Sequence, residues 1–130
     1  MKELEYPFDA AYIIKKRKSL KKALLADGTS RIRKKIAVLG GSTTSDIVKT
    51  LELFLLDAGI EPEFYESEYA QYFQDAMFPD ETLLSFKPDI VFIHTTNRNV
   101  TDWPEMTDTT EQIDEKLHTE LNRFTAMWKS

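Results

Sequence analysis

A short apolar run that ends in two glycines places the strongest constraint on the fold of this chain. Residues 36–39, Ile-Ala-Val-Leu, have the continuous apolarity of a buried strand, and Gly40, Gly41 and Ser42 follow directly. From residue 47 to residue 58, apolar side chains recur at the spacing of a helix. A strand, a tight turn and a helix in this order indicate an α/β fold, in which ligands bind beyond the carboxyl ends of the strands.

Two further strands follow this unit. Residues 63–66 predict a second strand, entered through a turn at residues 60–62. Residues 90–93 predict a third strand, which is apolar throughout and is therefore expected to be buried on both faces. Right-handed crossovers between parallel strands then predict a three-layer, flavodoxin-like sheet of strand order 2-1-3, flanked by helices.

Helices are predicted before and after the third strand. Residues 79–86 predict a short helix with Pro79 in its first turn. A last helix is capped by Thr109 or Thr110 and carries one apolar stripe. Because no fourth strand follows that helix, we expect the chain to be a fragment of a longer protein. The stripe consists of Ile113, Leu117, Leu121, Phe124 and Trp128.

A helix with a strongly basic face is predicted at residues 9–27, ahead of the α/β unit. This face is either a surface for an acidic partner or an ordinary solvated helix face. Because the basic run continues up to the first strand, we divide the chain into a basic helical arm, residues 1–34, and an α/β domain, residues 35–130. The basic side chains are Lys15, Lys16, Arg17, Lys18, Lys21 and Lys22.

Polar loops follow all three predicted strands, and the strand order brings them to one edge of the sheet. The winding direction changes between the first and third strands, so their loops should border the ligand crevice. Free N–H groups at the helix start after Thr44 favour an anion or a developing oxyanion, and Arg98 is a candidate partner for phosphate or carboxylate. Alternatively, the hydroxyl groups only cap the helix, because Thr43 and Asp46 have capping-box-like spacing. The candidate ligand-binding residues are Gly41, Ser42, Thr43, Thr44, Glu66, His94, Thr95, Thr96, Asn97, Arg98 and Asn99.

The composition argues against several classes of site. The chain has no cysteine and two histidines, so we expect no metal site in it. A net charge of -5 argues against a nucleic-acid partner. The glycine turn lacks both the dinucleotide fingerprint and the lysine of a P-loop. Because the sequence shows neither a signal peptide nor a membrane-spanning stretch, we expect a cytoplasmic protein without a membrane partner.

Four stretches of the chain, residues 12–16, 36–44, 51–69 and 86–99, resemble the N-terminal domain of FkbH-like proteins. Members of that family pair an SGNH-hydrolase-like α/β domain with a haloacid-dehalogenase (HAD) domain of class IIIC. The HAD domain uses magnesium to load a glyceryl unit from a phosphorylated precursor onto an acyl carrier protein. Its aspartate-rich motif is absent from this sequence. The resemblance therefore implies a chain without a cofactor of its own, whose partners are a downstream magnesium-dependent HAD domain and an acyl carrier protein.

The same resemblance assigns candidate catalytic residues. In SGNH hydrolases the first block ends in the nucleophilic serine, to which Ser42 corresponds here. A later block supplies an oxyanion asparagine, for which Asn97 is the nearest match and Asn99 the second. The glycine of the second block has no counterpart, and Asp114 and His118 have the wrong spacing for the Asp-His pair that activates the serine. Loss of that base costs several orders of magnitude in rate.

Three functions therefore remain open. In the leading hypothesis, a non-catalytic SGNH-like domain recognises a carrier-bound substrate through residues 42–44 and 95–99, and the basic helix meets the acidic carrier. The second is an SGNH-type esterase with Ser42 as nucleophile and the Gly41 and Ser42 N–H groups, with Asn97, as oxyanion donors. The third is a structural interaction module that docks through its last apolar stripe.

Overall fold

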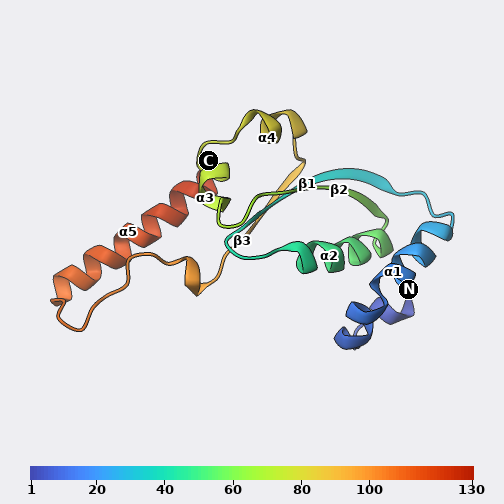
Figure 1. The fold of residues 1–130 in the computed structure, drawn as a ribbon, viewed down its shortest axis with the longest axis horizontal. Helices are drawn as coiled ribbons and strands as arrows, with labels where there is room; N and C mark the ends of the chain where they lie inside the picture. Colours follow the sequence, from blue (N-terminus) through green and yellow to red (C-terminus); the bar gives the residue numbers. More distant parts are fainter.

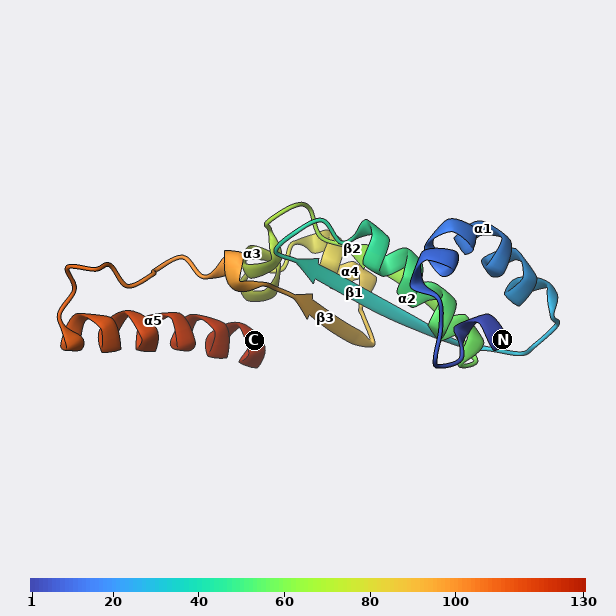
Figure 2. The same cartoon turned by 90° about the horizontal axis from the view of Figure 1, so that it is seen from below.

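The computed structural model describes residues 1–130 and has an α/β fold built on a three-stranded parallel sheet. The molecule is elongated, with α1 at one end and α5 at the other (Figure 1, Figure 2). Its strands are β1 (Ile32–Gly40), β2 (Ile60–Glu66) and β3 (Ile90–His94). Its helices are α1 (Ala10–Ala26), α2 (Ser45–Asp57), α3 (Tyr72–Met77), α4 (Glu81–Phe86) and α5 (Thr110–Lys129), with 3₁₀ turns η1 (Lys2–Leu4) and η2 (Asn97–Asn99).

β1 is the central strand of the sheet. It pairs in parallel with β2 on one side and with β3 on the other, which confirms the predicted order 2-1-3. Residues 36–40 of β1 are buried, as the apolar run predicts, because the strand has a neighbour on each side and helices on both faces. Gly40 lies opposite His94 and Val38 lies opposite Glu66, so all three strands end at the same edge.

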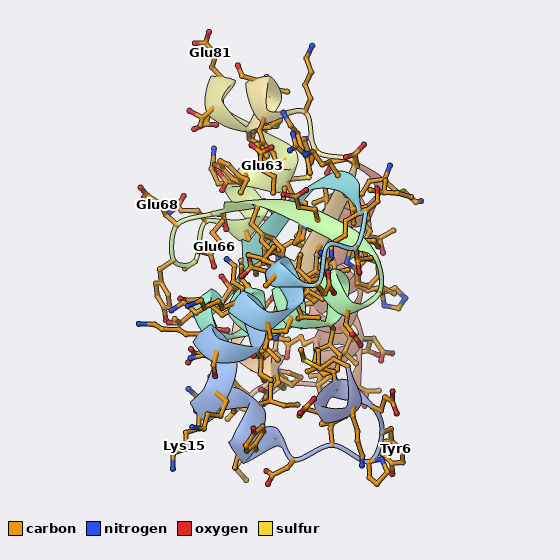
Figure 3. All side chains as sticks on the ribbon, turned by 90° about the vertical axis from the view of Figure 1, so that its right-hand side faces the viewer. Tyr6, Lys15, Glu63, Glu66, Glu68 and Glu81 are labelled. Atoms are coloured by element: carbon orange, nitrogen blue, oxygen red, sulfur yellow. The ribbon has the colours of Figure 1, made fainter.

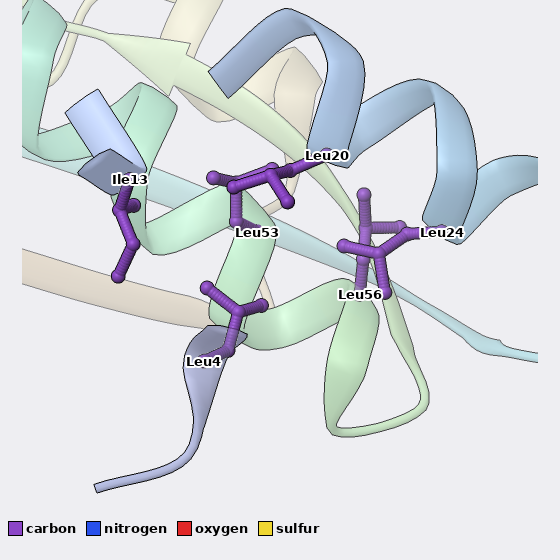
Figure 4. Close-up of a cluster of buried hydrophobic side chains, with 6 residues drawn as sticks. All are labelled: Leu4, Ile13, Leu20, Leu24, Leu53 and Leu56. Carbon is purple, nitrogen blue, oxygen red and sulfur yellow. The ribbon is translucent and has the colours of Figure 1, made fainter. Parts of the chain in front are cut away.

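Helices form a layer on each face of the sheet (Figure 1). On one face lies α2, and α1 packs on α2. On the other face lie α3, α4 and the C-terminal end of α5, which bury Ala37, Leu39, Tyr72, Leu83 and Met127 in one cluster. The contact between α1 and α2 is a second cluster, in which each leucine or isoleucine contributes about 2 kcal/mol on burial. Figure 4 shows its members: Leu4, Ile13, Leu20, Leu24, Leu53 and Leu56.

α1 begins and ends where its sequence predicts. Asp9 is the N-cap, and its carboxylate accepts a hydrogen bond from the N–H of Tyr12 at 3.0 Å. Beyond the last turn, Gly28 has a φ of +72°, a conformation that costs other residues about 1 kcal/mol. Because Ile13, Leu20 and other apolar side chains are buried against α2, this basic helix is packed on the α/β domain.

The segment after α1 joins the sheet earlier than predicted. The Arg31 guanidinium donates to the carbonyl oxygens of Leu24, at 2.7 Å, and Leu56, at 2.8 Å, which ties α1 to α2. Residues 32–34 then pair with residues 60–62 of β2. The interpretation of residues 32–34 as part of an arm outside the sheet is therefore wrong, because a basic strand that pairs at the sheet margin has the same sequence pattern as an arm.

β2 also begins earlier than predicted. The turn predicted at residues 60–62 is wrong, because these residues open the strand, and Pro62 lies within it opposite Lys34. Proline has no N–H group to donate, but β2 is an edge strand, where proline is tolerated.

The start of α5 agrees with the prediction from the sequence, and the start of α4 does not. α4 has Asp80 as its N-cap, with the carboxylate accepting from the N–H of Leu83 at 2.9 Å, so Pro79 precedes the helix instead of lying in its first turn. α5 is capped by Thr109, one of the two predicted residues, in a capping box with Gln112.

β3 is not buried on both faces, contrary to the prediction from its apolar sequence. Ile90 and Val91 are each 50% exposed and Phe92 is 39% exposed, because β3 forms an edge of the sheet. The apolar stripe of α5 is also largely uncovered, since Leu117 is 55% and Trp128 64% exposed. Much of α5 extends away from the sheet (Figure 2).

Candidate functional site

The carboxyl edge of the sheet gathers three polar loops, as the strand order predicts. Residues 41–44 follow β1, residues 67–71 follow β2, and residues 95–99, which include η2, follow β3. Because the strands are parallel and in register, these loops lie side by side at the end of β1.

Ser67 joins the second loop to the end of β1. Its hydroxyl accepts a hydrogen bond from the N–H of Gly40 at 3.1 Å, and its own N–H donates to the carbonyl of Val38 at 3.0 Å. The last β1 amide is therefore satisfied by a side chain from the neighbouring loop, which fixes the position of the second loop.

Asn99 joins the third loop to the glycine turn. Its side chain is buried, and its Nδ2 donates to the carbonyl oxygen of Gly41 at 2.9 Å. Its Oδ1 accepts from the N–H of Thr96 at 2.8 Å. A Cβ atom at Gly41 would lie 2.3 Å from the Asn99 amide, so only glycine allows this approach. The N–H of Gly41 in turn donates to the carbonyl of His94 at 2.9 Å.

A charged network anchors this junction to α5. Arg123 donates to the backbone carbonyl of Asn99 at 2.5 Å, to the Tyr72 hydroxyl at 3.1 Å and to the Glu120 carboxylate at 2.9 Å. The other carboxylate oxygen of Glu120 accepts from the Thr101 hydroxyl at 2.7 Å. Burial acts to raise the pKa of Glu120, but the hydrogen bonds from Thr101 and Arg123 outweigh it and lower the pKa to about 2.

The sequence interpretation did not include this network. The spacing of Glu120 and Arg123, three residues apart on one helix, is a signal for an ion pair. It does not reveal that the pair faces the sheet edge, because many exposed helices have the same spacing.

A small polar cavity of about 190 Å³ lies between the first and second loops. No residue of the third loop lines it, and the expectation that the first and third loops border a ligand crevice stays a prediction. The hydrogen bonds of Gly41 to Asn99 and His94 hold the first loop against the third. The lining residues are Ser42, Thr43, Thr44, Ser45, Glu66, Ser67 and Tyr69.

The hydroxyl groups of this cavity are not used to cap α2. Thr44 is the N-cap residue, but its side chain makes no hydrogen bond to the helix, and no capping box forms between Thr43 and Asp46. The hydroxyl-bearing residues of the lining are therefore candidate donors and acceptors for a polar ligand. Since Glu66 is the one charged residue in the lining, the cavity offers an anion no cationic side chain.

The remaining candidates of the third loop lie apart from this cavity. Asn97 and Arg98 are exposed, and the contact of Arg98 is made by its backbone N–H, to the Thr96 hydroxyl at 3.3 Å. Thr95 is half-buried and Thr96 is exposed. The structure thus brings Asn99, and not Asn97, to the glycine turn.

No base is hydrogen-bonded to Ser42. His94 is half-buried, and its Nδ1 is buried without a partner. His118 is exposed on α5, where its Nδ1 contacts the carbonyl of Asp114 at 2.8 Å. The Gly41 N–H, a proposed oxyanion donor, is already bonded to the carbonyl of His94. This arrangement can bind a polar group, but it does not assemble a nucleophile, a base and an oxyanion hole.

A larger apolar groove of about 670 Å³, which the sequence did not predict, lies on the face covered by α3, α4 and the end of α5. Leu83 and Leu84 of α4, Val91 of β3 and Trp128 of α5 contribute to its lining. Asp75 is at its edge, where burial and then the neighbouring carboxylates of Asp80 and Glu68 raise its pKa.

The basic face of α1 lies close to the start of α2. Arg17 forms an ion pair with Asp46, in the first turn of α2, at 2.8 Å. Lys21 pairs with Glu52 at 2.7 Å. Lys15, Lys16, Lys18 and Lys22 are exposed and lie within 4 Å of no carboxylate. In Figure 3, Lys15 lies at the lower side of the view, and Glu63, Glu66 and Glu68 lie above it.

The structure contains no group of three or more His, Asp or Glu side chains that could hold a metal ion. None of its helices combines the length and the apolarity needed to cross a membrane.

Neither a protein-family model nor a curated protein sequence matches the chain. Its fold is similar to a crystal structure of the N-terminal part of the protein BF1531 from Bacteroides fragilis, which contains a phosphatase domain and is complexed with Mg. The TM-score is 0.65 and the sequence identity 21%, over 85% of this chain. The chain spans 29% of the length of that solved chain. This similarity establishes a shared fold.

Proposed function

We propose that this chain is an accessory domain that recognises a carrier-bound substrate on behalf of a magnesium-dependent phosphatase-type domain of the same polypeptide. Two findings support the proposal. Residues 36–44 and 86–99 resemble FkbH-like proteins, whose HAD domain loads an acyl carrier protein. The fold is similar to the N-terminal part of a solved protein that contains a phosphatase domain.

The observation that carries the proposal is the set of lysines without an acidic partner on α1, the helix that is ion-paired to the first turn of α2. Lys15, Lys16, Lys18 and Lys22 have no acidic partner within the chain, although the chain as a whole is acidic. The Arg17–Asp46 ion pair holds their helix against the start of α2, whose preceding loop lines the cavity. An acidic carrier on these lysines would therefore present its substrate close to the Ser42–Ser45 hydroxyls. Such charge complementarity mainly raises the rate of association.

The geometry of the site supports recognition over catalysis by this chain. Ser42 has no hydrogen-bonded base, and the hydroxyls that line the cavity offer hydrogen bonds to a polar substrate group. In this proposal the phosphoryl chemistry and its magnesium belong to the other domain.

The test is a titration of the chain with an acyl carrier protein, followed by NMR or calorimetry at low ionic strength. The double variant Lys15→Glu, Lys18→Glu should bind about tenfold more weakly, because two reversed surface charges cost about 1–2 kcal/mol. The matched control, Lys87→Glu with Lys129→Glu, makes the same charge change on exposed lysines outside α1 and should bind almost as the wild type does.

Two results would contradict the proposal. One is the absence of binding by the wild-type chain. The other is equal weakening by the α1 pair and the control pair, which would mean that net charge alone governs the association.

A further inference from the structure

β3 is an edge strand with the sequence of a central strand. Its five residues, Ile-Val-Phe-Ile-His, include no Asp, Glu, Lys, Arg or Pro. β2, at the other edge of the sheet, carries Glu61, Pro62 and Glu63, which are features that block further strand pairing. An apolar edge without such features is a site at which another strand adds.

Both faces of β3 are incompletely covered. Val91 and Ile93 face α4, and the 50% exposed Val91 lies at the apolar groove. By strand alternation, Ile90 and Phe92 lie on the opposite face, where they are 50% and 39% exposed. Side chains that are apolar on both faces are typical of strands flanked by strands and covered by helices on each side.

The position of α5 determines where a following strand would lie. Its C-terminal end packs on the same sheet face as α3 and α4, since Met127 shares a cluster with Leu39 and the Ser130 hydroxyl donates to the carbonyl of Ala76 at 3.0 Å. Figure 2 shows α5 returning toward the sheet at this end. A right-handed crossover from β3 through a helix on that face leads to the outer side of β3, away from β1.

We propose that the outer edge of β3 accepts a fourth, parallel strand, apolar on both faces, from polypeptide that continues beyond Ser130 in a longer chain. This deepens the proposed function, because it identifies the surface on which the rest of the polypeptide joins this domain. The solved chain of similar fold has the required length, since this chain covers 29% of it.

A second copy of the chain fits this surface less well. Two β3 strands related by a twofold axis would pair in antiparallel fashion and fill the open edge. Ile90 and Phe92 would then still lack a covering helix in both copies. A strand followed by further α/β structure satisfies the edge and both faces together.

The experiment compares amide hydrogen exchange of residues 90–94 in the protein purified from its natural source with exchange in the 130-residue chain. The amides of buried β1 serve as an internal reference in both. We expect a natural product of greater intact mass, with exchange in β3 slowed by about 100-fold or more relative to the 130-residue chain.

Three outcomes would overturn the inference. The first is an intact mass equal to that of the 130-residue chain, and the second is equal exchange of the β3 amides in both proteins. The third is a 130-residue chain that is a dimer by light scattering and whose β3 amides are protected from exchange. Carrier binding depends on α1 and is measured separately. If the natural protein does not bind the carrier but its β3 amides are protected, the proposed function alone is refuted. Carrier binding with β3 unprotected in the natural protein would refute this inference alone.

A pair of variants gives a second measurement. In the natural protein, Ile90→Lys should lower the melting temperature by several degrees, because it buries a charge beside the added strand. The control is Ile14→Lys on α1, because Ile14 is 57% exposed and Ile90 is 50% exposed. Ile14→Lys should leave the melting temperature nearly unchanged. Equal effects of the two substitutions would contradict the inference.

Discussion

Replacing Glu120 by glutamine should remove a pH-dependent part of the stability of this fold. The Glu120 side chain is buried and joins α5 to Thr101 and to Arg123, which in turn holds the carbonyl of Asn99. Glu120→Gln keeps the size and shape of the side chain, but it removes the negative charge beside Arg123 and replaces one hydrogen-bond-accepting oxygen by an NH2 donor. The prediction therefore concerns the charge and not the packing.

The magnitude follows from the pKa of Glu120. A decrease from 4.5 in the unfolded chain to about 2 in the fold corresponds to about 3 kcal/mol of stability at neutral pH. Because the folded pKa is the lower one, this contribution is complete above about pH 4.5 and is lost as the pH falls through 2. At pH 3 less than half of this contribution remains.

The assay is urea unfolding followed by circular dichroism at pH 7, 4 and 3, for the wild type, Glu120→Gln and Glu115→Gln. Glu115 is an exposed glutamate on the same helix that forms no ion pair, so it controls for the substitution itself. The stability difference between the wild type and Glu120→Gln should shrink as the pH falls. A difference that is constant across these pH values would refute the electrostatic argument.

Two further predictions concern the glycine turn. Gly41→Ala should destabilise the fold by about 1–3 kcal/mol in urea unfolding, because the added Cβ would overlap the Asn99 amide. The control Gly28→Ala should cost about 1 kcal/mol, for the left-handed φ of Gly28 alone. Equal costs of the two substitutions would show that Asn99 does not constrain Gly41. A fluorophosphonate probe should leave Ser42 unlabelled at neutral pH, since no base is hydrogen-bonded to it, and labelling that Ser42→Ala abolishes would support the esterase instead.

Much of the fold follows from local sequence patterns. The strand at residues 36–39, the helix after Thr44 and the cap at Asp9 were all predicted correctly, because burial and capping leave signals within a few residues. The crossover rule then supplied the strand order. The strand starts at Ile32 and Ile60 were missed, because basic residues and a proline at a sheet margin have the same pattern in a strand as in a loop.

The exposure of β3 was not predictable from its own residues. The sequence of residues 90–93 correctly indicates a strand that suits burial on both faces, but burial also depends on which neighbours are present. The same limit applies to the α5 stripe, in which Phe124 packs against the sheet cluster while Leu117 and Leu121 are exposed. An apolar sequence pattern therefore indicates that a surface suits burial, but only the three-dimensional structure shows whether other residues cover that surface.

The choice between Asn97 and Asn99 shows how a site residue depends on one turn of backbone. Both lie in η2, two positions apart, so composition and spacing cannot separate them. Thr96 and Asn99 form a capping box, in which Asn99 Oδ1 accepts the Thr96 N–H. That bond folds the Asn99 side chain back over the loop, which leaves its Nδ2 to meet the carbonyl of Gly41, while Asn97 projects into solvent. The Thr-x-x-Asn spacing was therefore the available signal, and it explains why the third loop closes on the glycine turn and leaves the polar cavity on the side of β2.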